Sequence, residues 1–301
     1  MLDHNKHIVA SEYLFTKGDP IKATCYLLTA LHKQIGNKME AITAIGTTGS
    51  ARRLIGAMLS ANVIKNEITA HAIGARVLSP QVKTLLEIGG QDSKIILLEK
   101  GIVTDYGMNT LCAAGTGAFL SAQAERLGIA VKDMGQLALT SQNPARIAAR
   151  CTVFAESDLI HKAQVGHSKA DLVAGLCNAV VENYMTNVAK GKKIVTPILF
   201  GGGVSKNIAV TKAFEKHLDT EVFVHPNSHL MGAIGIAEIA AQTGSASFSY
   251  TNMEKTYKTQ SQTCFSCENN CEIVYFYGDN TLVDYWGNRC DKVQLKESLP
   301  A

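Results

Sequence analysis

The segment Lys83-Thr-Leu-Leu-Glu-Ile-Gly-Gly-Gln-Asp-Ser-Lys-Ile-Ile-Leu-Leu98 decides the fold. Its first six and last four residues have the composition of short strands, and Gly89 and Gly90 stand between them. Glycine adopts tight-turn conformations without steric cost and lets a ligand approach the backbone. The segment therefore predicts a hairpin whose turn offers a ligand bare backbone together with the polar groups of Gln91 and Asp92.

The order of strand, glycine turn and helix occurs on both sides of this hairpin. A strand at 39–45 leads into Gly46-Thr-Thr-Gly-Ser-Ala51, and an apolar strand at 194–200 leads into Gly201-Gly-Gly-Val-Ser205, each with a helical stretch behind it. Turns of this kind direct backbone N–H groups toward phosphates. The recurrence predicts a two-lobed α/β fold. We also expect strands at 8–16, 102–106 and 221–224, and helices at 20–36, 116–127, 134–139, 155–165, 169–190 and 230–242.

Two cysteines stand in matching positions ahead of predicted helices. Cys112 is followed at once by the small residues Ala113–Gly117, and Cys151 is followed by Thr-Val-Phe-Ala-Glu-Ser. The N-terminal end of a helix favours a thiolate or another anion. Either cysteine alone could equally be a buried structural residue.

Composition excludes several classes of protein. The chain has 301 residues, 46% of them hydrophobic, and a formal net charge of only +3 with its basic residues dispersed, so we expect neither disorder nor a nucleic-acid partner. No stretch reaches the roughly 20 apolar residues of a membrane span, and the charged N-terminus does not resemble a signal peptide. We expect a cytoplasmic protein, in which the eight cysteines are metal ligands or buried groups rather than disulfides.

The C-terminal part of the chain has a different composition. Residues 243–262 are rich in Ser, Thr, Gln and Lys, which predicts a linker or an irregular crossover. A cysteine-rich module follows, with Cys264, Cys267, Cys271 and Cys290. The two-residue spacer of the first pair is typical of metal sites, and structural zinc, an iron–sulfur cluster and free thiols are the alternatives, in that order.

Four motifs together resemble one family. They are Glu87–Lys94, Asn109–Gly117, Cys151–Asp158 and Gly201–Asn207. In this order they resemble the activators of 2-hydroxyacyl-CoA dehydratases, and the resemblance covers roughly residues 8–242. That family belongs to the acetate kinase, sugar kinase, Hsp70 and actin superfamily, which implies a two-lobed actin-like ATPase fold.

The resemblance implies an ATPase that transfers single electrons. Members of the family are homodimers that hold one 4Fe-4S cluster between two subunits, and the matching cysteines here are Cys112 and Cys151. Since a 4Fe-4S cluster usually takes four thiolates, two per chain require a partner chain. The small residues Ala113–Gly117 are expected to let that second subunit approach. The electron would come from ferredoxin or flavodoxin and pass to an acyl-CoA dehydratase or a related reductase.

The resemblance also assigns the nucleotide site. Gly89, Gly90 and Gln91 would lie near the β- and γ-phosphates of ATP, and Gly201-Gly202-Gly203 near the adenosine. Glu87 stands where the family usually has an aspartate that helps to hold Mg²⁺, so Glu87 and Gln91 are the catalytic candidates. The longer Glu87 side chain would displace the carboxylate by about 1 Å, a change that can matter for catalysis.

One departure from the family concerns the start of the chain. The family opens with a strand and an Asp-x-Gly-Ser-Thr phosphate loop, which this sequence does not contain, so we expect a fragment of a longer multidomain member. The predicted division is an N-terminal actin-like lobe at 1–105, a second lobe with the cluster cysteines at 106–245, and the linker with the cysteine-rich module at 246–301. Two other functions remain open: a small-molecule kinase of the same superfamily, and a truncated, non-catalytic metal-binding scaffold.

Overall fold

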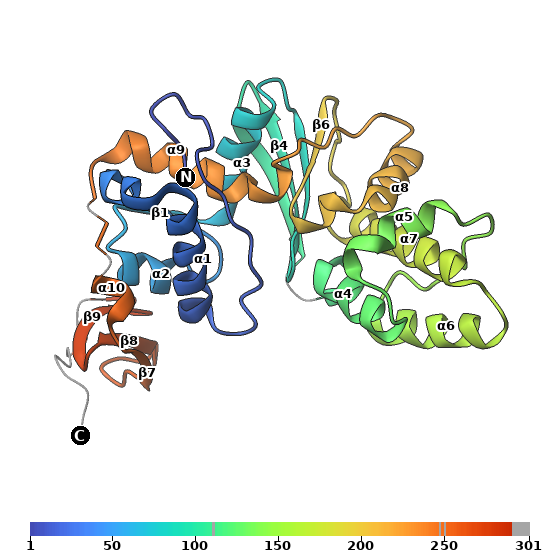
Figure 1. Cartoon of the computed structure of the whole chain (residues 1–301). Helices are drawn as coiled ribbons and strands as arrows, with labels where there is room; N and C mark the ends of the chain where they lie inside the picture. Colours follow the sequence, from blue (N-terminus) through green and yellow to red (C-terminus); the bar gives the residue numbers. More distant parts are fainter. Residues whose placement is uncertain (110–111, 247, 250, 291–301) are drawn as a thin grey trace. The chain divides into compact units, whose positions relative to one another are not determined.

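The computed structural model describes residues 1–290 except 110–111, 247 and 250 (Figure 1). The chain divides into two compact units. Unit 1 joins Met1–Glu67 to the part that begins at Ile236, and unit 2 is Ile68–Gly235. These units separate at other positions than the predicted lobes 1–105 and 106–245, whose boundaries stay a prediction.

Unit 2 is built on a four-stranded sheet in the order β5-β4-β3-β6. Strands β3 (Thr84–Ile88) and β4 (Ser93–Glu99) form the predicted hairpin, β5 (Ile102–Asn109) pairs antiparallel with β4, and β6 (Ile198–Gly201) pairs parallel with β3. Every residue of β3 and β6 is buried. Helices cover both faces of the central strands, which explains why these strands are apolar without alternation.

Successive residues of β3 belong to two different hydrophobic clusters. Leu85 packs with residues of α3 (Glu67–Leu78) on one face, whereas Leu86 packs on the other face with the helices that lie between residues 117 and 218. On this second face the rings of Tyr184 and Phe200 meet Phe214 edge to face, at centroid distances of 5.2 and 5.1 Å. The helices of this side are α4 (Gly117–Arg126), α5 (Met134–Leu139), α6 (Thr152–Gln164), α7 (Lys169–Asn187) and α8 (Ile208–Leu218). These elements confirm the helices predicted there.

Asp171 holds the start of α7. Its carboxylate accepts hydrogen bonds from the Ser141 hydroxyl (2.6 Å) and the Ser168 hydroxyl (2.7 Å), and from the backbone N–H of Asn143 (3.2 Å). These bonds lower the pKa of Asp171 to about 2, and the bond from the Ser141 hydroxyl has the largest effect. The charged carboxylate therefore ties the loop after α5 to the first turn of α7.

Helices α3 and α9 (Met231–Thr243) cross closely, and glycines make the approach possible. A Cβ atom on Gly74 would lie 2.1 Å from the carbonyl oxygen of Met231, and one on Gly235 would lie 1.8 Å from that of Ala70. Any larger residue would force the two backbones apart.

Unit 1 contains the N-terminal helices and the C-terminal sheet. Helix α1 (Pro20–Ile35) begins as predicted, because the Asp19 carboxylate accepts a hydrogen bond from the Lys22 N–H (2.9 Å) and proline occupies the first turn. Phe276 of the sheet packs into the cluster formed by the first helices. The other elements are a 3₁₀ helix Gly36–Ala41, β1 (Gly46–Thr47), α2 (Arg52–Leu59), β2 (Val63–Ile64), α10 (Thr251–Glu254), β7 (Tyr257–Thr263), β8 (Glu272–Gly278) and β9 (Thr281–Trp286).

Two sequence predictions in unit 1 are wrong, and one prediction in each unit is only partly right. Residues 8–16 make a single bridge, between Leu2 and Ile8, and 39–45 begin in a 3₁₀ helix rather than a strand. The predicted linker 243–262 contains most of β7, a polar strand whose backbone pairs antiparallel with its neighbour β8. At 221–224 only Phe223 makes a bridge, to Leu199.

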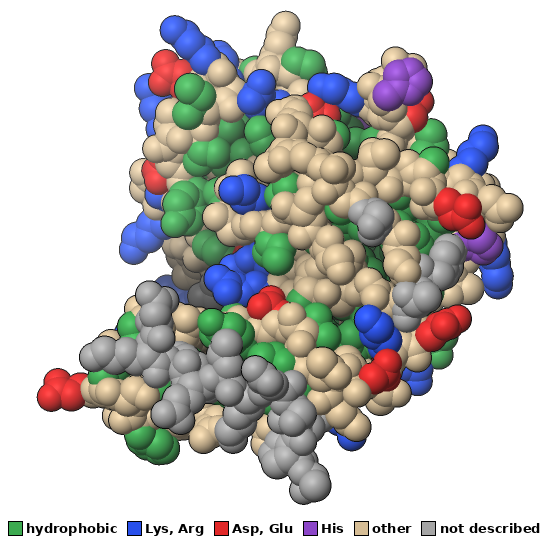
Figure 2. All heavy atoms as spheres, turned by 90° about the vertical axis from the view of Figure 1, so that its left-hand side faces the viewer, with side chains coloured by type: hydrophobic (Ala, Val, Ile, Leu, Met, Phe, Trp, Pro, Cys, Tyr) green, Lys and Arg blue, Asp and Glu red, His purple; other side chains and the backbone are tan. Residues whose placement is uncertain are grey.

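Charged side chains on the face in Figure 2 are mixed in sign. Lys and Arg lie singly or in small groups, interspersed with Asp and Glu. Among the helices of the described residues, none combines the length and the apolar character that crossing a membrane requires.

Candidate functional site

The turn after β3 is fastened to the first residues of α4. The N–H groups of Gly117 and Ala118 donate to the carbonyl oxygens of Gly89 (2.8 Å) and Gly90 (2.9 Å). Gly90 is exposed, and a Cβ atom at this position would meet nothing within 4 Å. The first amides of α4 thus bind the turn rather than a ligand, and Gly90 leaves its own backbone accessible to one.

The second glycine turn lies beside the first. Gly201 is paired with Glu87 in the parallel β3–β6 ladder, so both turns leave the sheet at the same edge. Gly202 has a φ of +83°, and a Cβ atom on it would lie 2.2 Å from the Ile88 carbonyl oxygen and 2.5 Å from Glu87 Oε1. Only glycine fits there. Gly203 begins the next 3₁₀ helix, so the predicted nucleotide residues of the two turns are brought together in unit 2.

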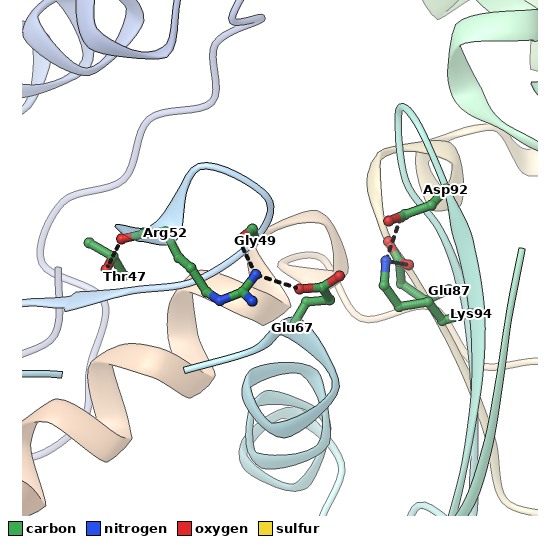
Figure 3. Close-up of polar contacts among 7 residues, drawn as sticks. All are labelled: Thr47, Gly49, Arg52, Glu67, Glu87, Asp92 and Lys94. Carbon is green, nitrogen blue, oxygen red and sulfur yellow. Dashed lines mark hydrogen bonds and ion pairs between the residues drawn. The ribbon is translucent and has the colours of Figure 1, made fainter. Parts of the chain in front are cut away.

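Glu87 belongs to a buried ionic network on the α3 side of the sheet (Figure 3). Lys94 Nζ lies 3.2 Å from Glu87 Oε2 and also contacts Asp92 Oδ1, and His71 Nε2 lies 3.9 Å from Glu87 Oε1. Lys94 and Glu87 are each only 3% exposed. Burial by itself lowers the pKa of Lys94, but the two carboxylates outweigh it and the pKa is raised. The lysine therefore holds both carboxylates beside the glycine turn.

Lys94 is the functional candidate that the sequence reasoning missed. The signal was present, because Lys94 is the direct cross-strand partner of Glu87 in the hairpin, and side chains opposite each other in a sheet share a face. From the other side of the sheet, the Tyr184 hydroxyl donates to the backbone carbonyl of Lys94 (2.6 Å). Gln91, the other catalytic candidate, lies exposed in the turn.

The two predicted cluster cysteines are brought to one place. Cys112 Sγ lies 3.6 Å from the carbonyl oxygen of Arg150, the residue before Cys151. Cys112 precedes the 3₁₀ helix Ala113–Gly115, and Cys151 precedes α6. Both thiols are free and partly exposed, which leaves them accessible to a ligand.

The small residues after Cys112 have a role within the chain. A Cβ atom on Gly115 would lie 2.6 Å from Asn183 Oδ1, and one on Gly117 would lie 2.9 Å from the Gly89 carbonyl oxygen. Ala114 and Gly115 are buried. Contacts within unit 2 thus already require small residues at Gly115 and Gly117, and the role of Ala113–Gly117 in the approach of a second subunit stays a prediction.

No group of three or more His, Cys, Asp or Glu side chains is arranged to hold a metal ion within the described residues. Cys112 and Cys151 supply two accessible thiols, which is half the number that a four-thiolate set needs. The side chains of Val153 and Phe154, directly after Cys151, are 64% and 65% exposed. Two exposed apolar side chains therefore follow Cys151 closely in the chain.

The turn at Gly46–Ala51 in unit 1 is closed by its own polar contacts (Figure 3). Arg52 Nη1 donates to the Gly49 carbonyl oxygen (2.9 Å) and lies 3.7 Å from Glu67 Oε2, and the Thr47 hydroxyl donates to the Arg52 carbonyl oxygen (2.7 Å). These contacts give Arg52 a structural role, which is to close the turn.

Residues 6–240 match the BadF/BadG/BcrA/BcrD ATPase family. The chain belongs to this family. It is 31% identical to a 2-hydroxyisocaproyl-CoA dehydratase activator of Clostridioides difficile, over 79% of this chain and 88% of the relative. It is 38% identical to an (R)-2-hydroxyglutaryl-CoA dehydratase activating ATPase of Acidaminococcus fermentans, over 57% of this chain and 66% of that relative.

A solved structure extends the comparison to the fold. The activator of the 2-hydroxyisocaproyl-CoA dehydratase from Clostridium difficile, solved with bound ADPNP, superimposes with a TM-score of 0.75 at 31% identity, covering 80% of this chain and 88% of that one. The predicted actin-like α/β fold and the resemblance to dehydratase activators are thereby confirmed. The chain spans about two thirds of the length of the Acidaminococcus relative.

Proposed function

We propose that the chain is the ATP-dependent one-electron activator, or reductase component, of a 2-hydroxyacyl-CoA dehydratase or a related acyl-CoA reductase. The observation that carries the proposal is the position of Cys112 Sγ, 3.6 Å from the carbonyl oxygen of the residue before Cys151, in the same compact unit as the two glycine turns. An ATPase site beside a paired thiol site is what such an activator needs. The names of the relatives supply the substrate class.

The nucleotide would be held by the turns after β3 and β6. Gly89, Gly90 and Gln91 would face the phosphates of ATP, with Gly90 leaving room for close approach, and Gly201–Gly203 would face the adenosine. Bound Mg²⁺ would neutralise phosphate charge. Glu87 would support that ion from within its pair with Lys94, which keeps the carboxylate oriented.

The hydrogen bonds between the first turn and α4 would couple the two sites. Gly89 and Gly90 hold the N–H groups of Gly117 and Ala118, and α4 follows closely after Cys112. A turn that shifts when the γ-phosphate is present or absent would therefore move the start of α4 and, with it, the thiol of Cys112. Differential contact with ATP and ADP is what biases such an equilibrium.

The thiols would hold one half of a 4Fe-4S cluster, which stores and releases single electrons. Two thiolates per chain leave two to be supplied by a second copy, so the proposal includes a homodimer. The exposed Val153 and Phe154 offer an apolar surface for that copy beside the thiols. Ferredoxin or flavodoxin would be the donor, the dehydratase or reductase the acceptor, and the cytoplasm the location, in keeping with the eight free thiols.

Iron binding tests the cluster. The full chain, purified without oxygen, is compared with Cys112→Ser and with a matched control, Cys25→Ser, whose partly buried thiol lies in α1 of unit 1. We expect the wild type and the control to contain iron and to be dimeric in light scattering. Cys112→Ser should lose both the iron and the dimer. Iron that remains at wild-type content in Cys112→Ser would refute the assignment.

Nucleotide binding is tested separately at Gly90. An added methyl group would meet no protein atom within 4 Å, so Gly90→Ala should fold normally, but the methyl would stand where the phosphates approach. We expect the dissociation constant for Mg²⁺-ATP, measured by calorimetry, to rise by about tenfold, which corresponds to 1.4 kcal/mol. Unchanged affinity in a normally stable variant would remove this turn from the nucleotide site.

A further inference from the structure

Four cysteines near the C-terminal sheet of unit 1 have no part in the proposed ATP and electron chemistry, whose residues belong to unit 2. They are Cys264, Cys267, Cys271 and Cys290, all free and all partly exposed. These four partly exposed thiols flank the strands of one small sheet, so we asked whether the fold brings them together.

Cys264 and Cys271 oppose each other at one end of this sheet. The β7–β8 ladder runs to the pair Thr263 and Glu272, and the Cys264 N–H donates to the Cys271 carbonyl oxygen (2.7 Å), which adds one further pair in the same register. Residues directly opposite in an antiparallel ladder share a face, with Cβ atoms about 4.5–5.5 Å apart. Both cysteines pack on the face that carries Tyr275.

Cys267 lies in the turn that joins this pair. The Asn270 N–H donates to the Cys267 carbonyl oxygen (3.3 Å), and Asn270 itself has a φ of +44°. The chain therefore reverses between Cys267 and Asn270 and returns directly to Cys271. Two residues separate Cys264 from Cys267, the spacing found where two thiolates of one turn bind the same metal ion.

The chain returns along β9 to the same end of the sheet, and Cys290 follows shortly after this strand. Trp286 is paired with Val274 of β8, and the next residue, Gly287, has a φ of +100°. A Cβ atom on Gly287 would lie only 2.1 Å from the Glu272 carbonyl oxygen, so the backbone after β9 lies against the residue that follows Cys271. Three residues later the chain reaches Cys290.

We propose that this end of the sheet is a structural zinc site with Cys264, Cys267, Cys271 and Cys290 as its four thiolate ligands. A Zn–S bond of about 2.3 Å in a tetrahedron places the sulfur atoms about 3.8 Å apart, which two directly opposed cysteines can reach by side-chain rotation. A cuboidal iron–sulfur cluster spreads its thiolates around four metal ions, and neighbouring strand positions suit it less well.

The side chains of the described residues do not already converge as a ligand set. Zinc therefore has to draw the 265–270 turn and Cys290 toward the Cys264–Cys271 pair. Metal binding stabilises most where a face has little core of its own, and among the described residues the buried members of this cluster are Ile273, Tyr275 and Tyr277. The free energy of metal binding would add directly to the stability of the sheet.

The metal content of the full chain tests the proposal. Elemental analysis of wild type and of the double variant Cys112→Ser/Cys151→Ser should find about one zinc ion per chain in both, because the proposed cluster thiols are not ligands here. After chelation, a titration with Co²⁺ alone should give the visible absorption of a tetrahedral cobalt thiolate. Zinc that disappears with Cys112 and Cys151, or no uptake of Co²⁺, would overturn the proposal.

Single variants locate the site. Cys271→Ser and Cys290→Ser should each bind zinc at least tenfold more weakly, whereas Cys25→Ser should bind it as the wild type does. Trp286 lies in β9, the strand that leads to Cys290, and its fluorescence reports the unfolding of this sheet, so chelation should lower the unfolding midpoint of the wild type but not that of Cys271→Ser. Wild-type zinc affinity in both ligand variants, iron instead of zinc at these cysteines, or a Cys264–Cys271 disulfide in place of metal would each refute it.

Discussion

Replacement of Lys94 by methionine should destabilise unit 2 far more than the loss of one surface charge would. Lys94 Nζ lies 3.2 Å from Glu87 Oε2 and contacts Asp92, and the side chains of Lys94 and Glu87 are each 4% exposed. At an effective dielectric constant of about 20, opposite charges at 3.2 Å attract by about 5 kcal/mol. Much of this attraction offsets the cost of burial, but removal of one partner leaves the other charge buried and unpaired, which costs about 3–5 kcal/mol.

Urea unfolding measures this loss and assigns it to a unit. The chain's only tryptophan, Trp286, is partly buried against a hydrophobic cluster of unit 1, whereas most of the helical signal in circular dichroism comes from unit 2. With a slope of about 2 kcal/mol per molar urea, Lys94→Met should lower the midpoint of the circular dichroism transition by about 2 M. The tryptophan transition should not move.

Two further variants isolate the cause. Lys192→Met breaks a more exposed ion pair of the same unit, with Asp105, and should lower the urea midpoint far less than Lys94→Met does. Lys94→Met combined with Glu87→Gln removes both charges and should recover part of the lost stability. A Lys94→Met midpoint within error of that of Lys192→Met, or an equal shift in the tryptophan signal, would refute the reasoning.

Three other predictions concern unit 2. Gly202→Ala should cost several kcal/mol, because its Cβ atom would lie 2.2 Å from a carbonyl oxygen, whereas Gly128→Ala, also at positive φ but with no atom within 4 Å, should cost about 1 kcal/mol in thermal unfolding. Tyr184→Phe removes the 2.6 Å hydrogen bond to the Lys94 carbonyl and should cost about 1 kcal/mol; no change in the urea midpoint would contradict this. The pKa of Asp171 is lowered to about 2 in the folded chain. The charged carboxylate therefore contributes stability that is fully present above the pKa of the unfolded chain and is lost as the pH falls toward 2. The stability difference between wild type and Asp171→Asn should therefore shrink between about pH 5 and pH 2, and a constant difference would contradict the assignment.

Local signals in the sequence were enough for many elements. The Gly89-Gly90 turn between apolar runs predicted the β3–β4 hairpin, and Asp19-Pro20 predicted the start of α1. Such signals act between residues close in sequence, so they can be recognised without the fold. Strand β7 was missed because its polar residues have no apolar alternation of their own, and its hydrogen bonds depend on β8.

The sequence by itself determined the family, the α/β fold class and the residue types of the candidate site, because motifs and turns are short-range features. Only the tertiary structure decided which of these residues meet. The parallel pairing of β3 with β6 brings Gly202 against Glu87, and the packing of loops places Cys112 beside Arg150. These contacts join residues far apart in the chain, and they form because the elements that bury the two faces of one sheet pack closely together.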